Sequence, residues 1–264
     1  MDAPRHTSAQ AGSRPQGSPS DRSQRMIRDL VPRGIAAVES FGTPPPSCFV
    51  YPEESAIVAR AVPGRRNEFG AVRDCARLAM AELGFAPAPV LRGSAGDPIW
   101  PTGLVGSMAH CAGYQVAVIA RADEVAAVGV DAEPNEPLPE NGMLEMVGSP
   151  GECDMVAELA GRFSHINWDR LLFSAKESIY KAWYPFARRW LGFEDAVVRL
   201  DPRTGTFTAR LLTAGPVVAG DEVNTLAGRW ISQRGLLLTV ITVPRPAGAG
   251  PVDRSTRARG QSAG

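Results

Sequence analysis

The stretch Leu171-Leu-Phe-Ser-Ala-Lys-Glu-Ser-Ile-Tyr-Lys-Ala-Trp-Tyr184 predicts the helix around which the rest of the chain is arranged. It contains the only two lysines of the sequence, so all but two of the 28 Lys and Arg residues are arginines. Where nearly every cation is an arginine, a compact ammonium that is retained indicates a position that a guanidinium cannot fill. Lys176 and Lys181 are therefore candidate functional residues.

The predicted helix has two faces. Its apolar stripe consists of Leu172, Ala175, Ile179, Ala182 and Trp183, and a second, polar face consists of Ser174, Glu177, Ser178 and Lys181. Pro185 is expected to end the helix. A purely structural interpretation is also open: Glu177 and Lys181 form a surface pair worth about 0.2–0.5 kcal/mol, and Ser174 and Glu177 form a capping box.

Length and composition limit the class of protein. The chain has 264 residues, a 44% apolar composition and a formal charge of zero, which predicts one large or two small domains and no broad basic surface for nucleic acid. No apolar run approaches the roughly 20 residues of a membrane span. The four cysteines include no C-x-x-C pair, which argues against a zinc site or a disulfide framework and favours a cytoplasmic location.

The two ends of the chain differ from its middle. Residues 1–25 and 245–264 are rich in Ser, Arg, Pro and Gly without apolar periodicity, so both are expected to be disordered tails. Met26 is a candidate for the native start. We expect the folded part to consist of an N-terminal half at 26–124 and a C-terminal half at 125–244.

The N-terminal half contains two predicted elements and an ambiguous arm. Residues 27–41 suit a short helix or an extended arm, residues 67–83 repeat apolar side chains at helical spacing, and residues 115–120 read as a buried strand. The arginines of the 67–83 helix, with Arg66 before it, fall largely off its apolar stripe, which predicts a solvated face unless a phosphate lies beside it. Residues 87–101 read as loop.

A pair of carboxylates follows the next predicted strand. Residues 125–130 are β-prone, and if the strand continues to Pro134, a period of two residues places Asp131 and Glu133 on one face. Neighbouring carboxylates repel unless a cation lies between them. Carboxylate oxygens suit magnesium, which shares its shell with substrate phosphates.

The rest of the C-terminal half is predicted to be mostly antiparallel sheet. Residues 196–200, 205–212 and 226–243 alternate as strands do, and a turn at Gln233-Arg-Gly235 predicts a terminal hairpin. Residues 136–169 are polar, rich in Pro and Gly, and cannot be assigned. Ser107 and His110 lack a G-x-S-x-G context, so a hydrolase triad is poorly supported, and the sequence has no phosphate loop or dinucleotide fingerprint.

Seven motifs in this order carry a resemblance. Val128-Gly-Val-Asp-Ala-Glu-Pro134 and Phe173-Ser-Ala-Lys-Glu-Ser-Ile-Tyr-Lys181 resemble the paired signature of the 4′-phosphopantetheinyl transferases. The enterobactin-type branch, above all its actinobacterial members, is similar at five further segments: Arg65-Arg-Asn-Glu-Phe69, Arg73-Asp-Cys-Ala-Arg77, Pro98-Ile-Trp-Pro101, Gly106-Ser-Met-Ala-His-Cys111 and Trp190-Leu-Gly-Phe-Glu-Asp195. The resemblance covers residues 27–243.

The resemblance implies an α+β fold, a monomeric pseudo-dimer of two similar halves with the active site in the cleft between them. It implies an enzyme that transfers the phosphopantetheine arm of coenzyme A to a serine of an apo acyl or peptidyl carrier protein and releases adenosine 3′,5′-bisphosphate. The pathway served, whether polyketide, non-ribosomal peptide, siderophore or fatty-acid synthesis, is not fixed by family membership.

Individual residues carry over by position. Asp131, Glu133 and Glu177 match the family's ligands for Mg²⁺, with Mn²⁺ as an alternative metal, and Lys176 and Lys181 match its catalytic and pyrophosphate-contacting lysines. The residues that match its coenzyme A phosphate contacts are Arg65, Arg73, Arg92, Ser107 and His110. Ala95 departs from the pattern, because close relatives often have a second cation there.

The implied mechanism leaves two alternatives open. Glu177 would take the proton of the carrier serine, Lys181 would stabilise the departing bisphosphate, and Lys176 would stabilise the transferring group. One alternative is a non-catalytic binder of coenzyme A or carrier proteins. The other is a magnesium-dependent hydrolase of nucleotide diphosphates, which would use water at the same metal site.

Overall fold

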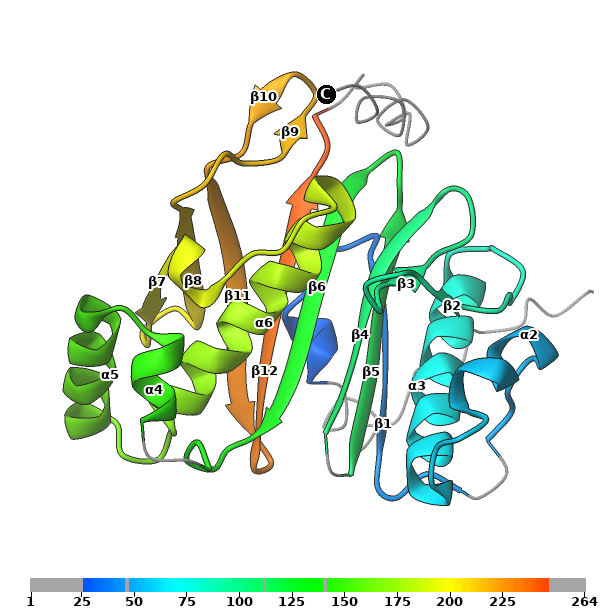
Figure 1. Cartoon of the computed structure of the whole chain (residues 1–264), viewed down its shortest axis with the longest axis horizontal. Coiled ribbons are helices and arrows are strands. Elements are labelled where there is room, and N and C mark those ends of the chain that lie inside the picture. Colours follow the sequence, from blue (N-terminus) through cyan, green and yellow to red (C-terminus); the bar gives the residue numbers. More distant parts are fainter. Residues whose placement is uncertain (1–25, 46–47, 112, 140–141, 247–264) are drawn as a thin grey trace, which may run out of the picture.

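A computed structural model describes residues 26–45, 48–111, 113–139 and 142–246, and these form a mixed helix and sheet fold (Figure 1). The predicted α+β class is therefore confirmed. The tail predicted at 1–25 lies outside the described residues, as does the tail predicted at 245–264 apart from its first two residues.

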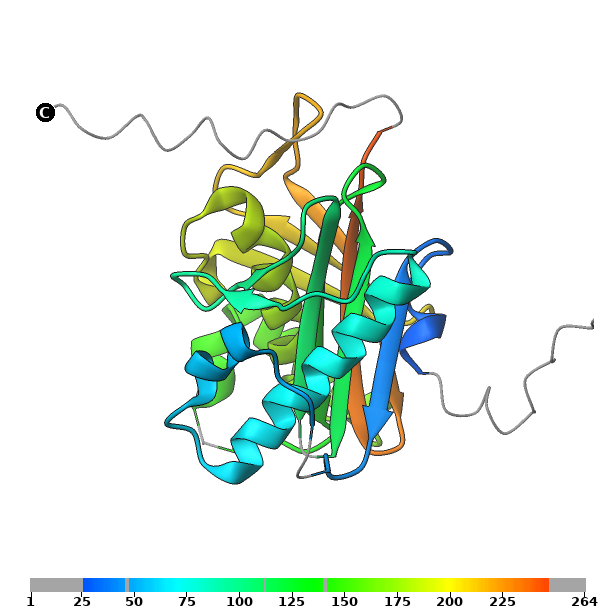
Figure 2. The same cartoon turned by 90° about the vertical axis from the view of Figure 1, so that its right-hand side faces the viewer.

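The first sheet has three antiparallel strands in the order β1-β5-β4. These are β1 (Ala36–Phe41), β5 (Tyr114–Arg121) and β4 (Leu104–Cys111). Helix α3 (Pro63–Glu82) lies diagonally across the strands (Figure 2) and buries Ala76, Ala79 and Met80 against Ala117 and Ile119. The helix predicted at 67–83 is thus confirmed, and it begins four residues earlier because proline is well suited to the first helical turn.

Short elements flank this sheet. The predicted arm at 27–41 consists of a 3-10 turn, η1 (Ile27–Asp29), followed by β1, and the loop predicted at 87–101 contains a small hairpin of β2 (Leu91–Arg92) and β3 (Pro98–Ile99). Between β1 and α3 lie α2 (Pro52–Ser55) and η2 (Ala56–Val58).

The second sheet has five antiparallel strands in the order β6-β12-β11-β8-β7. These are β6 (Val125–Pro134), β12 (Leu236–Pro244), β11 (Thr225–Gln233), β8 (Thr206–Leu211) and β7 (Ala196–Asp201). They confirm the strands predicted from alternation, including the terminal hairpin, in which Arg234 and Gly235 both have a positive φ, as a tight two-residue turn requires.

Helix α6 (Trp168–Ala187) packs on one face of this sheet, and α4 (Met143–Val147) and α5 (Pro150–Arg162) lie beyond it (Figure 1). These two helices and the start of α6 occupy the segment that the sequence left unassigned. The prolines of residues 136–169 obscured the helical periodicity of this segment. Pro150, however, is the first residue of α5, a position at which proline favours a helix. The remaining elements are η3 (Phe193–Asp195), β9 (Val217–Val218) and β10 (Asp221–Glu222).

Two predictions about α6 were wrong. The helix continues past Pro185 to Ala187, because a proline in the last turn removes only one intrahelical hydrogen bond. Ser174 does not cap the helix: it lies inside α6, where its hydroxyl is 3.0 Å from the hydroxyl of Thr239 on β12.

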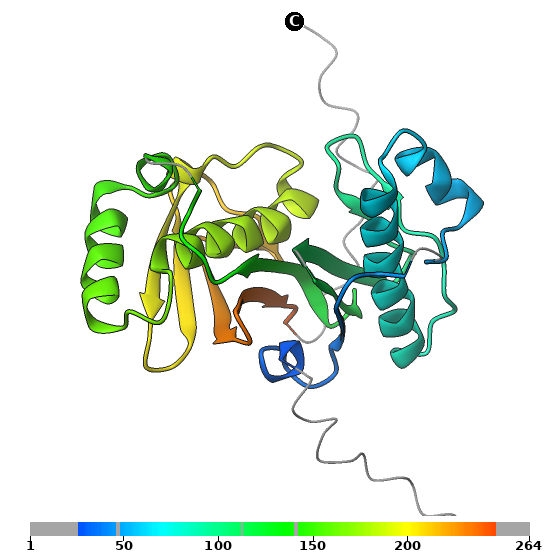
Figure 3. The same ribbon diagram turned by 90° about the horizontal axis from the view of Figure 1, so that it is seen from below.

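The two sheets share a core where β4 of the first contacts β6 of the second. This core contains Val116 and Val118 of β5, Val128 and Val130 of β6, and the segment around η1. Figure 3 shows η1 beneath the line along which the sheets meet. The boundary predicted at 124/125 falls between β5 and β6.

Candidate functional site

A cavity of about 430 Å³ brings most of the predicted site residues together. One wall comes from α3, the β2–β3 hairpin and β4, and the other comes from α6. Seven of the ten predicted residues line it, together with Tyr180 and Tyr184: Arg65, Arg73, Arg92, Ser107, His110, Glu177 and Lys181. The sequence therefore identified side chains that lie far apart in the chain and meet in space.

A glycine sets the distance between β6 and α6. A Cβ built on Gly129 would lie 1.9 Å from the Ser178 carbonyl oxygen, so only glycine lets the helix backbone approach this closely. The alternation of β6 sends Val128 and Val130 into the shared core, which leaves Gly129, Asp131 and Glu133 facing the helix. The predicted common face of the two carboxylates is confirmed.

Lys181 pairs with the first of these carboxylates. Its Nζ donates to Asp131 Oδ1 at 2.7 Å and to the Val130 carbonyl at 3.1 Å. The other oxygen, Asp131 Oδ2, is buried and has no hydrogen-bond partner among the described residues. An unpaired buried carboxylate oxygen is costly, so this atom is suited to a further cation.

Two more carboxylates lie within electrostatic reach of Asp131. Burial, and next the charge of Asp131, raise the pKa of both Glu133 and Glu177. Glu133 also accepts a hydrogen bond from Arg170 at 3.1 Å. These three carboxylates fit a hard divalent cation in donor chemistry. Within the described ranges, however, no three Asp, Glu, His or Cys side chains are gathered closely enough to form a metal cluster.

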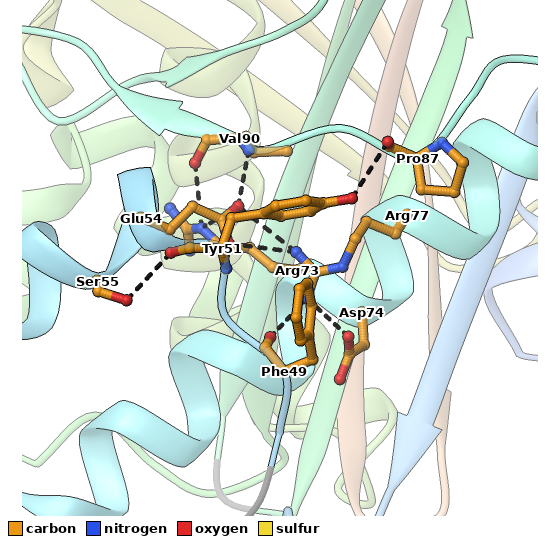
Figure 4. A network of polar contacts seen from close by, with 9 residues as sticks. All are labelled: Phe49, Tyr51, Glu54, Ser55, Arg73, Asp74, Arg77, Pro87 and Val90. Carbon is orange, nitrogen blue, oxygen red and sulfur yellow. Dashed lines mark hydrogen bonds and ion pairs between the residues drawn. The ribbon is translucent and has the colours of Figure 1, made fainter.

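Arg73 and Arg77 correct a prediction made from the sequence. They were expected on a solvated face, but they are only 6% and 7% exposed and surround the fully buried Glu54 (Figure 4). Glu54 lies 3.5 Å from Arg73 Nε and 3.3 Å from Arg77 Nη1. It also accepts the Val90 N–H at 2.7 Å. A helical period counts arginine as polar and cannot detect a buried partner on another element.

Arg73 is thereby held at the cavity wall. Its Nε donates to the Val90 carbonyl at 3.1 Å, and its guanidinium carbon lies 3.3 Å from the centre of the Phe69 ring. Burial lowers the pKa of Arg73 to about 10, although Glu54 acts in the opposite direction. The group remains charged at neutral pH and faces the cavity, so it can bind an anion.

Arg65 and His110 form a second polar contact in the cavity, with Arg65 Nη1 and His110 Nε2 2.6 Å apart. Since Arg65 is a donor only, Nε2 accepts and the proton of the neutral imidazole is on Nδ1. Burial, followed by the charge of Arg65, lowers the pKa of His110. The side chain of Ser107 already has a partner in the protein: its Oγ accepts the Val130 N–H at 3.1 Å and so links β4 to β6.

The β2–β3 hairpin completes the cavity wall. Arg92 and Ala95 line the cavity, and Asp97 next to them forms a 2.7 Å ion pair with Arg188, the residue after α6. The hairpin beside the first sheet is therefore tied directly to the end of the helix that packs on the second sheet.

Lys176 is not brought to the cavity. It is 4% exposed, and its Nζ donates to Glu152 Oε2 at 3.0 Å and to the Phe193 carbonyl at 2.7 Å. Five helical residues separate it from Lys181, which places the two side chains about 140° apart around the axis. The sequence already indicated that the two lysines lie on different faces, since the polar face predicted for the helix included Lys181 and Glu177 but not Lys176.

Several residues of the site were missed from the sequence. Tyr180 and Tyr184 lie three and seven residues after Glu177, a spacing that indicates the cavity face of α6. Glu54 follows a proline at the start of a helix, a position typical of capping carboxylates. Arg170 left no signal, because its partner Glu133 lies 37 residues earlier.

Comparison with known proteins covers both sheets. The model of the 4′-phosphopantetheinyl transferase N-terminal domain matches residues 53–120, and the model of the 4′-phosphopantetheinyl transferase superfamily matches residues 127–226. The transferase Svp of Streptomyces mobaraensis is 50% identical over 225 residues, which are 84% of this chain and 91% of Svp. The chain belongs to the 4′-phosphopantetheinyl transferase superfamily.

Two further relatives agree. PptT of Mycobacterium tuberculosis is 48% identical over 226 residues (83% of this chain and 98% of PptT), and Npt of Nocardia iowensis is 40% identical over 224 (82% and 99%). All three are named 4′-phosphopantetheinyl transferases, so this protein is an enzyme of that class and the predicted actinobacterial resemblance is confirmed.

The matched segments of the 4′-phosphopantetheinyl transferase models contain every predicted residue that lines the cavity, from Arg65 to His110 in the first and Glu177 and Lys181 in the second. Within the described part of this transferase, no helix is long and apolar enough to cross a membrane.

Proposed function

We propose that the protein transfers the 4′-phosphopantetheine group of coenzyme A to a serine of an apo acyl or peptidyl carrier protein and releases adenosine 3′,5′-bisphosphate, in a magnesium-dependent reaction. One observation carries the proposal: a single cavity joins cations of the first sheet's elements to the carboxylate and lysine of α6. Coenzyme A carries three phosphate groups, and their binding requires the cations. The reaction at its diphosphate requires the carboxylate and the lysine.

The cations of the first wall bind the nucleotide end of coenzyme A. Arg73, Arg65, Arg92 and His110 line the cavity. Guanidinium groups suit phosphate oxygens because they donate two hydrogen bonds in one plane. Arg73 is the strongest contributor, since its side chain is already immobilised by Glu54 and Phe69 and loses little freedom on binding.

The side chains of α6 and β6 act on the diphosphate. The carrier serine attacks the phosphorus next to pantetheine, its Oγ–P bond forms, and the bond from that phosphorus to the bridging oxygen breaks. Glu177 accepts the serine proton, a role favoured by the raised pKa of its carboxyl. Lys181 holds the negative charge that develops on the departing bisphosphate.

Asp131, Glu133 and Glu177 would hold the metal. Magnesium, when bound, neutralises charge on the diphosphate as a Lewis acid. Support comes from the unpartnered Asp131 Oδ2 and from the donor set, which is made only of carboxylates. A ready-made cage is not required, because magnesium usually binds through one or two carboxylates together with substrate phosphates.

The same proposal covers architecture and partners. The chain is monomeric and cytoplasmic, and it is a pseudo-dimer of two similar halves with the active site between them. Strands β1-β5-β4 of the first half correspond to β6-β12-β11 of the second, and a long helix packs on each set. Carrier proteins of polyketide, non-ribosomal peptide, siderophore or fatty-acid synthases are its protein substrates. Their acidic surfaces suit the arginines around the cavity.

The test is the intact mass of an apo carrier protein after incubation with this protein, coenzyme A and magnesium. The mass of one phosphopantetheine is gained if the proposal is right, and the gain is absent with a chelator or with Glu177→Ala. Release of free pantetheine phosphate without a mass gain would instead identify a hydrolase, and binding of coenzyme A without turnover would identify a binding protein.

A further inference from the structure

Two buried glutamates begin helices in the same way. The sequences are Tyr-Pro-Glu-Glu54 at the start of α2 and Ser-Pro-Gly-Glu152 at the start of α5, with the glutamate as the third helical residue in each. One carboxylate oxygen of each accepts the N–H of the residue before the proline, at 3.0 Å for Glu54 and 2.8 Å for Glu152. Both side chains are almost completely buried.

The second oxygen of each glutamate makes a matching contact. Glu54 Oε1 accepts the Val90 N–H and Glu152 Oε1 accepts the Val198 N–H, both at 2.7 Å. Each valine belongs to the segment that follows the long helix of its half, Val90 after α3 and Val198 after α6. Each glutamate therefore ties the start of a short helix to the chain beyond the long one.

A cation from the long helix completes each arrangement. Arg77, 23 residues after Glu54, lies 3.3 Å from its Oε2 and donates to the Phe49 carbonyl at 2.7 Å (Figure 4). Lys176, 24 residues after Glu152, lies 3.0 Å from its Oε2 and donates to the Phe193 carbonyl at 2.7 Å. Lys176 thus occupies in the second half the place that Arg77 has in the first.

From this repetition we infer that Lys176 and Glu152 form a positioning pair that fixes α6, and hence Glu177 and Lys181, at the cavity, and that Lys176 does not touch substrate. The inference rests on the proposed function. Two of the three N–H donors of Lys176 are bound inside the protein and its side chain is 3% exposed, whereas the side chain of Lys181 is 28% exposed and lines the cavity.

A double-mutant cycle separates positioning from substrate contact. Lys176→Met keeps the length of the side chain but leaves Glu152 buried without its cation, so the melting temperature falls by roughly 10 °C and kcat falls about tenfold. The Kd of coenzyme A, measured by calorimetry without carrier protein, stays within about twofold. Adding Glu152→Gln removes the unpaired charge and recovers part of the lost kcat and melting temperature, because the amide still has one acceptor oxygen for the two backbone N–H groups.

Lys181→Met is the matched control, since it makes the same substitution on the same helix. It is expected to differ in two readouts: coenzyme A binding weakens, and Glu152→Gln does not recover the lost kcat. If Lys176→Met does not fold, the double variant alone gives the answer, because its Kd for coenzyme A remains near wild type.

A tenfold or larger weakening of coenzyme A binding in Lys176→Met or in the double variant would overturn the inference and make Lys176 a phosphate ligand. Losses that simply add in the double variant would also overturn it. Failure of the proposed function would give a different result, because the wild-type protein itself would modify no carrier. The effects of the same substitutions on melting temperature and coenzyme A affinity could still be measured.

Discussion

Gly129→Ala tests whether the close approach of α6 to β6 creates the reactive pair. The new Cβ would lie 1.9 Å from the Ser178 carbonyl oxygen and 2.8 Å from the Ala182 nitrogen, and both are backbone atoms that no side-chain rotation can move. The helix must retreat by about 1.5 Å before the first contact reaches the 3.4 Å of ordinary packing.

Two effects follow from that retreat. Overpacking of this kind costs about 1–3 kcal/mol, which for a protein of this size lowers the melting temperature by about 2–12 °C. The 2.7 Å contact between Lys181 and Asp131 is lost, since it spans the same two elements. A displacement of about 1 Å in a catalytic group costs about 100-fold in rate, so kcat for transfer falls by about that factor.

The assay combines thermal unfolding with the initial rate of carrier modification. Gly161→Ala is the matched control, because its Cβ meets nothing within 4 Å and it lies in the last turn of α5. This change stabilises the protein by about 0.5–1 kcal/mol and leaves the rate unchanged. Wild-type stability and rate in Gly129→Ala would refute the reasoning.

Three further predictions concern charge. Glu54→Gln removes the carboxylate partner of buried Arg73 and leaves buried Arg77 with Asp74, so the melting temperature falls by roughly 10 °C. Glu53→Gln, its exposed neighbour, changes the melting temperature little, and equal effects would contradict the network. The pKa of Glu177 is raised, so its ionisation costs stability as pH rises from about 4.3 through the folded pKa. Glu177→Gln therefore raises the melting temperature at pH 7 but not at pH 4, measured with chelator, and a decrease at pH 7 would contradict this. Arg65→Ala raises the pKa of His110, as NMR titration would detect, and an unchanged pKa would exclude the contact.

The sequence predicted the parts of the fold that depend on local pattern. The strands of the second sheet and helix α3 could be read from periodicity, and the common face of Asp131 and Glu133 follows from a period of two residues. Pro150 misled the same method, because a proline that begins a helix looks like a break when the helix is short and polar.

The missed features all depend on partners distant in the chain. Arg77 is polar by any local measure, and the fully buried carboxylate that it contacts, Glu54, lies 23 residues earlier in the chain. Lys176 was selected for its residue type and its family position, but its neighbour on α5 determines where its charge goes. Periodicity identifies the face of a helix on which a side chain lies, whereas its partner becomes visible only in the folded chain.

A crystal structure with coenzyme A and magnesium tests the central claim most directly, which is that the cavity between the two sheets is the transfer site. We predict the nucleotide phosphates within hydrogen-bond distance of Arg73 and His110, and the diphosphate beside Lys181 with the metal on Asp131. Coenzyme A bound elsewhere on the protein, with these side chains free of contact to it, would contradict the account.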